Sequence, residues 1–340
     1  MFYSTIIYAP DKSGQALRAT ICAPDKSGQT LWATNDPGWD HSLIAQITLL
    51  IRIFASTINF QMETEKAPLH LDVEKILNDK SPRLGKLLPG FIIRYLKRIV
   101  HQDDINDIIK NHGHLRGSAF NDGALSYMGI KYRSHGLENL PSGGRNIFVS
   151  NHPLGGLDGM VFMSELSKYY SAIKFPVNDI LLYIDNYSDI FLPVNKVGSF
   201  GREAAKLLEE AYNSDCQLLN FPAGICSRKI NGVITDLQWQ KSFIVRAVQY
   251  QRDIVPCFFS GRNSSFFYNL AKIRQHLGIK MNIEMLYLAD EMFRQKGQDI
   301  DLYFGEAIPW QTFDKSKSPQ QWADLVREKT YDLQKRYSTR

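Results

Sequence analysis

The pattern of apolar and polar positions is most regular between residues 131 and 340, where short apolar runs alternate with amphipathic stretches. The apolar runs predict strands at 146–150, 217–221, 254–259 and 300–304, and the amphipathic stretches predict helices at 159–170, 201–213, 239–250 and near 318–335. This alternation indicates an α/β domain, with a central, mostly parallel sheet flanked by helices. In such folds catalytic loops usually lie at strand ends.

Residues 62–130 predict a helical segment ahead of that domain. Three helices are expected, at Leu71–Leu77, Pro89–Val100 and Asp103–Ile109. In the second helix, apolar and basic side chains separate onto opposite sides at about 100° per residue. The apolar side carries Phe91, Ile92, Tyr95, Leu96, Ile99 and Val100, and the basic side carries Arg94, Lys97 and Arg98. Two interpretations stay open: a helix lying on a membrane with its cations toward lipid phosphates, or a core-facing helix with a solvated basic face.

Residues 1–61 show no such period. Residues 9–20 nearly repeat at 23–34, and both copies are rich in turn formers, which predicts a poorly structured tail. A sharper hypothesis is that Met62 is the biological start. The apolar stretch 43–60 is interrupted by Arg52 and several polar residues, so no uninterrupted transmembrane span is predicted.

Composition and charge narrow the choice of partner. The chain has 340 residues, 44% of them hydrophobic, and a net charge of +5, which is too weak to argue for nucleic acid but compatible with an anionic lipid surface. Its four cysteines form no C-x-x-C pair, so neither a zinc site nor a disulfide framework is predicted. We expect no bound metal.

The densest chemistry lies at residues 146–159. The apolar run 147–149 delivers His152 into a loop rich in Pro and Gly, and Asp158 follows six residues later. A His at a strand end, with a carboxylate a short loop away, is a way to build an oriented general base. Gly155 and Gly156 let the short loop fold back, and their backbone N–H groups are candidates to stabilise an oxyanion.

Three further blocks are weaker when taken alone. In 191–202, Lys196 and Arg202 bracket a Gly-Ser-Phe-Gly turn at a predicted helix start, where a phosphate could bind. In 218–229, a strand enters a Phe-Pro-x-Gly turn and then a polar, basic loop. In 254–259, Pro256 interrupts an apolar strand. Each also fits an ordinary loop, turn or sheet strand.

In this order and spacing, the four blocks resemble the glycerolipid acyltransferase family over about residues 130–310. The family's Asn-His-x4-Asp motif supplies the base, which implies a His152–Asp158 dyad. Its second block matches Phe191–Lys196, its third, Phe-Pro-Glu-Gly-Thr-Arg-Ser, matches Phe221–Ser227, and its fourth matches Ile254–Phe258, while Trp239–Phe243 resembles the segment after the third block. The resemblance implies acceptor or phosphate contacts at Lys196, Arg202, Gly224, Ser227, Arg228 and Lys241.

Two departures bear on the substrate. Five residues, rather than four, separate His152 from Asp158. In the third block, Ala223 stands where the family has Glu, Cys226 holds the place of its Arg, and Arg228 comes two residues later. Because that block helps to position the acceptor head group in the family, these changes put a glycerol-phosphate acceptor in doubt.

The resemblance implies a lipid O-acyltransferase. We expect it to move a fatty acyl group from acyl-CoA or acyl carrier protein to a hydroxyl of a lysophospholipid or related acceptor, with no bound cofactor, at the cytoplasmic face of the membrane. One alternative is an O-acyltransferase acting on an N-acyl amino acid lipid, since similar enzymes contribute to aminolipid synthesis in some bacteria. Another is a non-catalytic acyl-chain-binding protein of the same fold.

Overall fold

A computed structural model describes residues 7–10, 16–19, 70–80, 88–177, 184–193, 199–279 and 282–338. The chain divides into two compact units, Met1–Thr48 and Leu49–Arg340. In the first unit, β1 (Ile7–Pro10) and β2 (Ala16–Ala19) pair antiparallel. The rest of the predicted tail 1–61, including the apolar stretch 43–60, lies outside the described residues, as does Met62.

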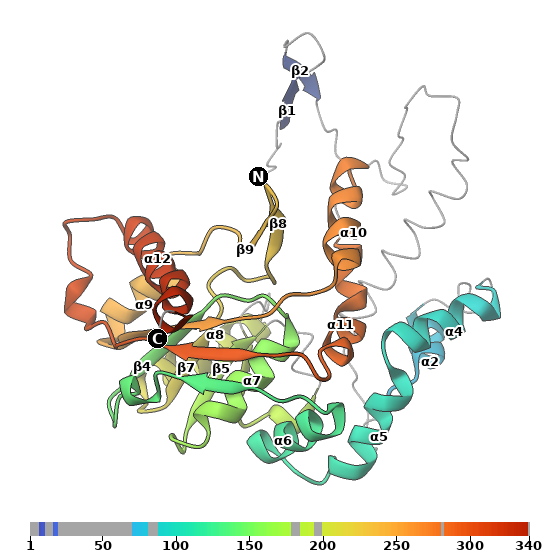
Figure 1. The fold of residues 1–340 in the computed structure, drawn as a ribbon, viewed down its shortest axis with the longest axis horizontal. Coiled ribbons are helices and arrows are strands. Elements are labelled where there is room, and N and C mark those ends of the chain that lie inside the picture. The colour runs from blue at the N-terminus through green and yellow to red at the C-terminus, as the bar shows by residue number, and fades with distance from the viewer. Residues whose placement is uncertain are drawn as a thin grey trace. The chain divides into compact units, whose positions relative to one another are not determined.

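The second unit is built on a seven-stranded sheet (Figure 1). The strands are β3 (Arg133–His135), β4 (Asn146–Ser150), β5 (Ile173–Val177), β6 (Phe191–Pro193), β7 (Gln217–Asn220), β10 (Asp253–Phe259) and β11 (Asp301–Phe304). Their order is β3-β11-β10-β4-β7-β5-β6. All neighbouring pairs run parallel except β10 and β11, which run antiparallel. The predicted α/β fold with a mostly parallel sheet is confirmed.

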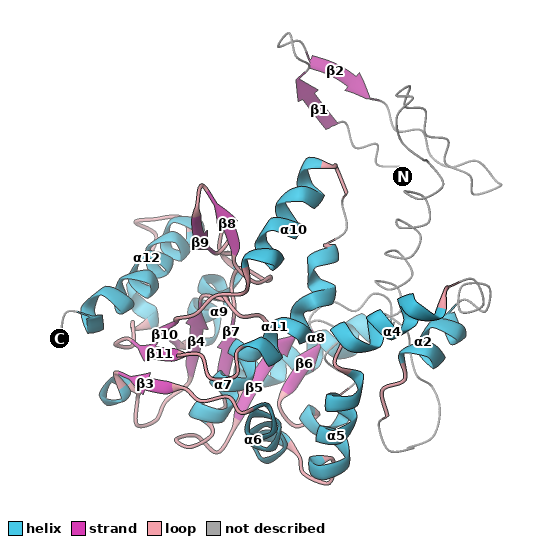
Figure 2. Ribbon diagram, turned by 45° about the vertical axis from the view of Figure 1, so that its right-hand side comes forward, coloured by secondary structure: helices cyan, strands magenta, loops and turns pink. Residues whose placement is uncertain are grey.

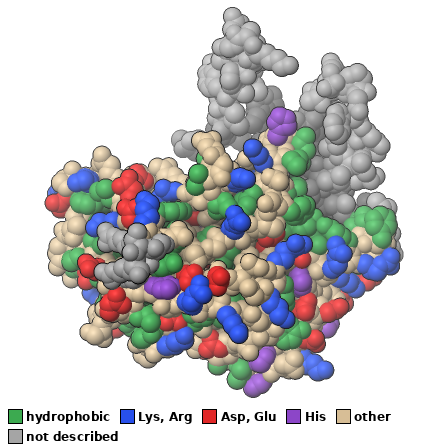
Figure 3. All heavy atoms as spheres, in the orientation of Figure 1, with side chains coloured by type: hydrophobic (Ala, Val, Ile, Leu, Met, Phe, Trp, Pro, Cys, Tyr) green, Lys and Arg blue, Asp and Glu red, His purple; other side chains and the backbone are tan. Residues whose placement is uncertain are grey.

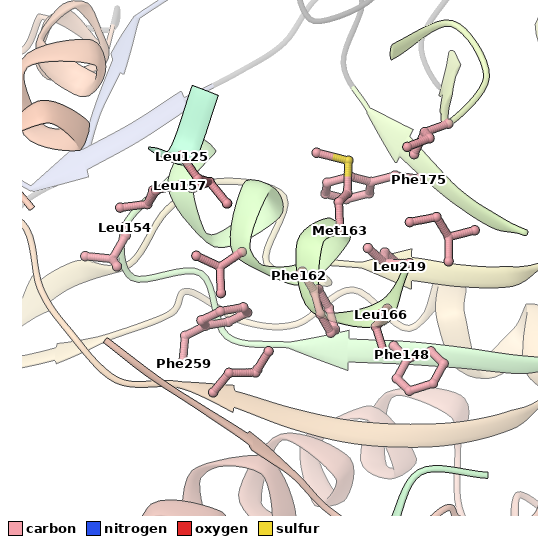
Figure 4. Close-up of a cluster of buried hydrophobic side chains, with 14 of the residues drawn as sticks. Leu125, Phe148, Leu154, Leu157, Phe162, Met163, Leu166, Phe175, Leu219 and Phe259 are labelled. Carbon is pink, nitrogen blue, oxygen red and sulfur yellow. The ribbon is translucent and has the colours of Figure 1, made fainter. Parts of the chain in front are cut away.

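Helices cover both faces of the sheet (Figure 2). Those on the sheet are α6 (Gly117–Met128), α7 (Gly156–Leu166), α8 (Ser199–Asn213), α9 (Ser242–Tyr250) and α12 (Pro319–Ser338). Helix α10 (Ser265–His276) projects away from the sheet, and α11 (Leu288–Arg294) packs on α7. Strand β4 is buried along its whole length, because successive side chains enter opposite cores. Phe148 joins the core with α6 and α7, whereas Ile147 and Val149 join the core with α9 and α12. Figure 4 shows Phe162 and Leu166 of α7 in the first core, near Phe148 and Leu219.

A helical segment precedes the sheet, as expected. It consists of α2 (Val73–Lys80), α4 (Gly90–Ile99), α5 (Gln102–His112) and then α6. The predicted apolar side of α4 is divided: Ile99 is buried, whereas Phe91 and Tyr95 are exposed. Ile93, outside that side, is also buried. Helix α4 is therefore neither a wholly core-facing helix nor one with its whole apolar side free.

The sequence pattern missed some elements for physical reasons. Strand β5 contains Lys174 and Pro176, which dilute its apolar run. Helix α10 carries apolar side chains both on its buried side and on an exposed side, so no single apolar face emerges from its sequence. Strands β3 and β6 have three residues each, too few for a period to show.

Candidate active site

The candidate site lies where β4 ends beside β10. Asn151, the first residue after β4, is buried and pins the two strands together: its Nδ2 donates to the Phe259 carbonyl at 2.9 Å, and its Oδ1 accepts from the Phe259 N–H at 2.7 Å. Because β4 and β10 are parallel, both chains leave the sheet at the same edge. This clamp fixes the point at which the next residue, His152, begins the loop.

His152 and Asp158 lie in direct contact. The His152 Nδ1 is 3.0 Å from the Asp158 Oδ2, and the imidazole stacks on the Phe221 ring at a centroid distance of 4.1 Å. The His152 side chain is 17% exposed, whereas that of Asp158 is fully buried. The extra residue between them, compared with the family motif, therefore does not separate the pair.

The loop reaches this geometry through its glycines. Gly155 has φ +73°, which glycine adopts far more readily than other residues, and it immediately precedes α7. Asp158 thus stands in the first turn of α7, whose N-terminal end favours a carboxylate. Gly156 also lies against a neighbouring helix, since a Cβ there would meet the Met292 Sδ at 3.1 Å.

Burial dominates the electrostatics of Asp158. Desolvation raises the pKa of this carboxyl, and the hydrogen bond from His152, the imidazole's charge and the Leu154 N–H lower it in part. The Leu154 N–H donates to the Asp158 Oδ2 at 2.8 Å, so one carboxylate oxygen receives both bonds. The other oxygen, Oδ1, is buried without a partner among the described residues. Asp158 is thus held in one orientation by His152 and the loop backbone.

A second carboxylate, Asp236, supports the loop from outside the sequence motif. It is buried, and its Oδ1 accepts from the His152 N–H at 3.2 Å and from the Ser227 Oγ at 2.5 Å. Its Oδ2 accepts from the Trp239 Nε1 at 2.8 Å. Sequence reasoning missed Asp236. Only its position three residues before the recognised Trp239–Phe243 segment pointed to it.

Asp236→Asn should lower the free energy of unfolding by about 1–3 kcal/mol and reduce kcat. An amide offers one acceptor oxygen where the carboxylate offers two, so a buried donor loses its partner. Urea unfolding and steady-state rates measure the two effects. The matched control is Asp299→Asn, because the Asp299 side chain is 83% exposed in a surface ion pair with Arg133. Equal stability of both variants would show that Asp236 does not brace the loop.

The third block folds against the dyad, but the side chains of Ser227 and Arg228 turn inward, whereas Lys229 at its end is exposed. The Ser227 N–H donates to the His152 carbonyl at 2.7 Å, and the Ser227 side chain is buried against Asp236. Arg228 is also buried: it donates to the Cys226 carbonyl at 2.8 Å and to the Glu284 Oε1 at 3.1 Å. Only Gly224, with φ +72°, faces open space in its turn.

Glu284 is itself fully buried and pairs with a second cation. Its Oε2 accepts from the Arg274 Nε at 2.8 Å. The charge of Arg228 is thus shared within an Arg–Glu–Arg cluster, and its guanidinium is not turned to solvent.

Among the described residues, no hydrogen bond or ion pair joins the remaining predicted contacts to His152 or Asp158. Lys241 is exposed at the start of α9 and lines a groove of about 520 Å³ with Gln240, Ser242, Val245, Arg246 and Gln249, none of them a dyad residue. Arg202 is exposed on α8. Lys196 lies outside the described residues. Within the described part of the chain, no group of three or more His, Cys, Asp or Glu side chains is placed to hold a metal ion.

Comparison with known proteins identifies the family. A family model described as "Acyltransferase" matches residues 75–339. Two curated relatives are named lyso-glycine lipid O-acyltransferase. The chain is 46% identical over 271 residues to the one from Bacteroides thetaiotaomicron, covering 79% of this chain and 100% of the relative. It is 44% identical over 271 residues to the one from Phocaeicola vulgatus, covering 79% and 97%.

The chain belongs to the glycerolipid acyltransferase family. It is an acyltransferase that acts in lipid metabolism. This confirms the family expected from the four sequence blocks and favours an enzyme over a non-catalytic acyl-binding protein.

One solved structure is also similar, the 1-acyl-sn-glycerophosphate acyltransferase PlsC from Thermotoga maritima. It superposes with a TM-score of 0.40 at 15% identity, covering 86% of this chain and 94% of that chain. No helix among the described residues is both long and apolar enough to cross a membrane.

Proposed function

We propose that this acyltransferase transfers a fatty acyl group from an acyl thioester to a hydroxyl of a lyso-glycine lipid, with His152 as the general base. The observation that carries the chemistry is the 3.0 Å contact between the His152 Nδ1 and the buried Asp158 Oδ2. The acceptor is proposed because both relatives are lyso-glycine lipid O-acyltransferases by name.

The geometry selects the reacting nitrogen of His152. A carboxylate accepts hydrogen bonds, so Asp158 holds the tautomer with its proton on Nδ1, and the lone pair is then on Nε2. The acceptor hydroxyl gives its proton to Nε2 as its oxygen bonds to the thioester carbon. The C–S bond then breaks, and the leaving sulfur takes the proton from the imidazolium. The N–H groups of Gly155 and Gly156 are our candidates to stabilise the intermediate oxyanion.

The third block supports an acceptor without a phosphoglycerol group. Ala223 stands where the family has a carboxylate near the head group, and Arg228 is paired with the buried Glu284. A phosphate would therefore find the Arg228 guanidinium already engaged. An N-acyl amino acid lipid with a free hydroxyl, the alternative acceptor expected from the sequence, fits this site better than lysophosphatidate.

The donor and the location complete the proposal. We propose acyl-CoA or acyl carrier protein as donor, with the cations Lys196, Arg202 and Lys241 as candidates for its phosphates or for the acceptor's anionic group. No cofactor is required, because the acyl group arrives activated as a thioester. We place the enzyme at the cytoplasmic face of the membrane, as a peripheral protein, because its proposed acceptor is a lipid.

The test is a donor and acceptor panel with the purified full chain. Oleoyl-CoA and oleoyl carrier protein are each combined with lyso-glycine lipid or lysophosphatidate, while thiol release and product mass are followed. We expect turnover with lyso-glycine lipid at least about tenfold faster than with lysophosphatidate. Preference for lysophosphatidate would refute the acceptor, and donor binding without thiol release would refute the chemistry.

A further inference from the structure

Helix α10 carries an exposed apolar stripe that the mechanism does not use. We call Phe266 and Ile273, together with Leu277 at the C-terminal cap of the helix, the α10 stripe, and each is at least 50% exposed. Their spacings of seven and four residues place them within about 40° of one another on the helix. The helix buries a different side, which carries Phe267, Tyr268, Ala271 and Arg274. The stripe is therefore an additional apolar face, distinct from the one that packs on the domain.

Aromatic contacts join this stripe to α4. The Phe266 ring meets the Tyr287 ring edge-on, with centroids 4.9 Å apart. The Tyr287 hydroxyl is 2.8 Å from that of Tyr95, on the same exposed side of α4 as Phe91. Figure 3 shows apolar side chains over α10 and α4 on one face of the molecule. The two helices thus share an apolar surface that extends well beyond one helix.

Cations border this surface. Arg98 lies with its guanidinium 5.4 Å from the centre of the Tyr95 ring, and Arg94 is exposed one turn earlier on α4. On α10, Lys272 is exposed next to Ile273 in the sequence. A cavity of about 520 Å³ lies at the junction, lined by residues that include Arg98, Phe266 and Arg294. Apolar and aromatic side chains bordered by cations are typical of surfaces that rest on anionic lipid.

The surface is connected to the dyad through one short helix. A Cβ on Gly155 would meet Leu288 of α11 at 3.0 Å, and one on Gly156 would meet Met292 at 3.1 Å, so this side of α11 touches the catalytic loop. Other α11 residues, Asp290 and Arg294, line the cavity beneath α4 and α10. A lipid held at that surface would lie one helix away from His152.

We propose that the α10 stripe, together with the exposed side of α4, docks on an anionic lipid bilayer and inserts Phe266, Ile273 and Leu277 at the head-group boundary. The proposal rests on the lipid acceptor of the proposed function. Docking supplies the acceptor directly from the membrane, so it matters for acceptors in vesicles and not for those dispersed as monomers.

The test compares two double variants of the full chain. Ile273→Asp with Leu277→Asp adds charge to the stripe, and Tyr169→Asp with Val248→Asp is the matched control, since these side chains are 49% and 38% exposed and belong to neither the stripe nor the Lys241 groove. Sedimentation with vesicles of phosphatidylglycerol and phosphatidylcholine should show binding weakened by about tenfold or more in the stripe variant. The control should bind as the wild type does, and salt should weaken wild-type binding.

Activity separates docking from catalysis. The stripe variant should lose turnover with vesicle-held acceptor and keep it with a short-chain monomeric acceptor. Wild-type vesicle binding by the stripe variant, or equal loss in the control, would overturn the proposal. Loss of turnover with acyl carrier protein alone, on the monomeric acceptor, would make the stripe a protein-docking site and also overturn it. Vesicle binding is measured without substrate, so it remains decisive if the acceptor assignment fails.

Discussion

His152→Ala should lower kcat/KM by about 10²–10⁴-fold, the range expected for losing a positioned general base. Because Asp158 holds the proton on the His152 Nδ1, the His152 Nε2 is the proton acceptor, and Asp158 cannot replace it when the imidazole is removed. The fold should persist, because the imidazole is partly exposed and the Asp158 carboxylate keeps its bond from the Leu154 N–H when the imidazole is removed. Thiol release from acyl-CoA and circular dichroism measure the two properties on the same sample.

The control for this variant is His114→Ala, which removes an exposed histidine ahead of α6. It should retain wild-type turnover. Added imidazole should restore part of the activity of His152→Ala if the missing group is a base. Turnover within threefold of wild type in His152→Ala would show that the proton leaves by another route.

Much of the architecture could be predicted from sequence because the central strands are buried on both faces. Strand β4 falls at the predicted residues 146–150, and β7 and β10 differ from prediction by one residue at one end. A strand covered on both sides places successive side chains in two cores, so its middle is a continuous apolar run, such as 147–149 in β4, and that run marks it in the sequence. Helix α10 has no such signature, since its second apolar face serves a purpose other than packing on this domain.

The site was predictable only as far as it is local. His152 and Asp158 are joined by one short loop, and glycines allow that loop to close despite its extra residue. Asp236 reaches His152 across 84 positions, and Glu284 reaches Arg228 across 56. The hydrophobic periodicity of one sequence does not predict these long-range contacts, because they depend on how the loops pack above the sheet edge.

The buried carboxylates near the site have two different roles: Asp236 and Glu284 stabilise loops, whereas Asp158 acts on His152. Asp236 and Glu284 each accept from several buried donors, so they hold the loops that follow β4 and β7. Asp158 differs, since its hydrogen-bond partners among the described residues are only the His152 imidazole and the Leu154 N–H. Carboxylates that satisfy many donors stabilise a fold, whereas one that is poorly compensated costs stability and is kept for its effect on a neighbour.

Asp158→Asn should therefore separate activity from stability. The amide cannot stabilise the imidazolium that forms during transfer, and it can hold the wrong tautomer, so kcat should fall by about 10²–10⁴-fold. The free energy of unfolding at pH 7 should change by only about 1 kcal/mol, because the removal of a buried charge offsets the cost of an amide NH2 group without an acceptor at the Oδ1 position. Steady-state kinetics and urea unfolding measure both.

The pH dependence of the stability difference between Asp158→Asn and wild type tests whether the buried charge is its cause. Burial raises the pKa of Asp158 above its ordinary value, so the folded protein holds this proton more tightly than the unfolded chain. Wild-type stability from this group is complete below the ordinary pKa of aspartate and falls as the pH rises through the raised pKa. Asp158→Asn lacks that fall, so its stability relative to wild type should grow as the pH rises from about 4 toward 7. A variant that instead becomes relatively less stable over this interval would show that His152 and Leu154 compensate the buried charge fully, and the cost ascribed here to the dyad would be absent.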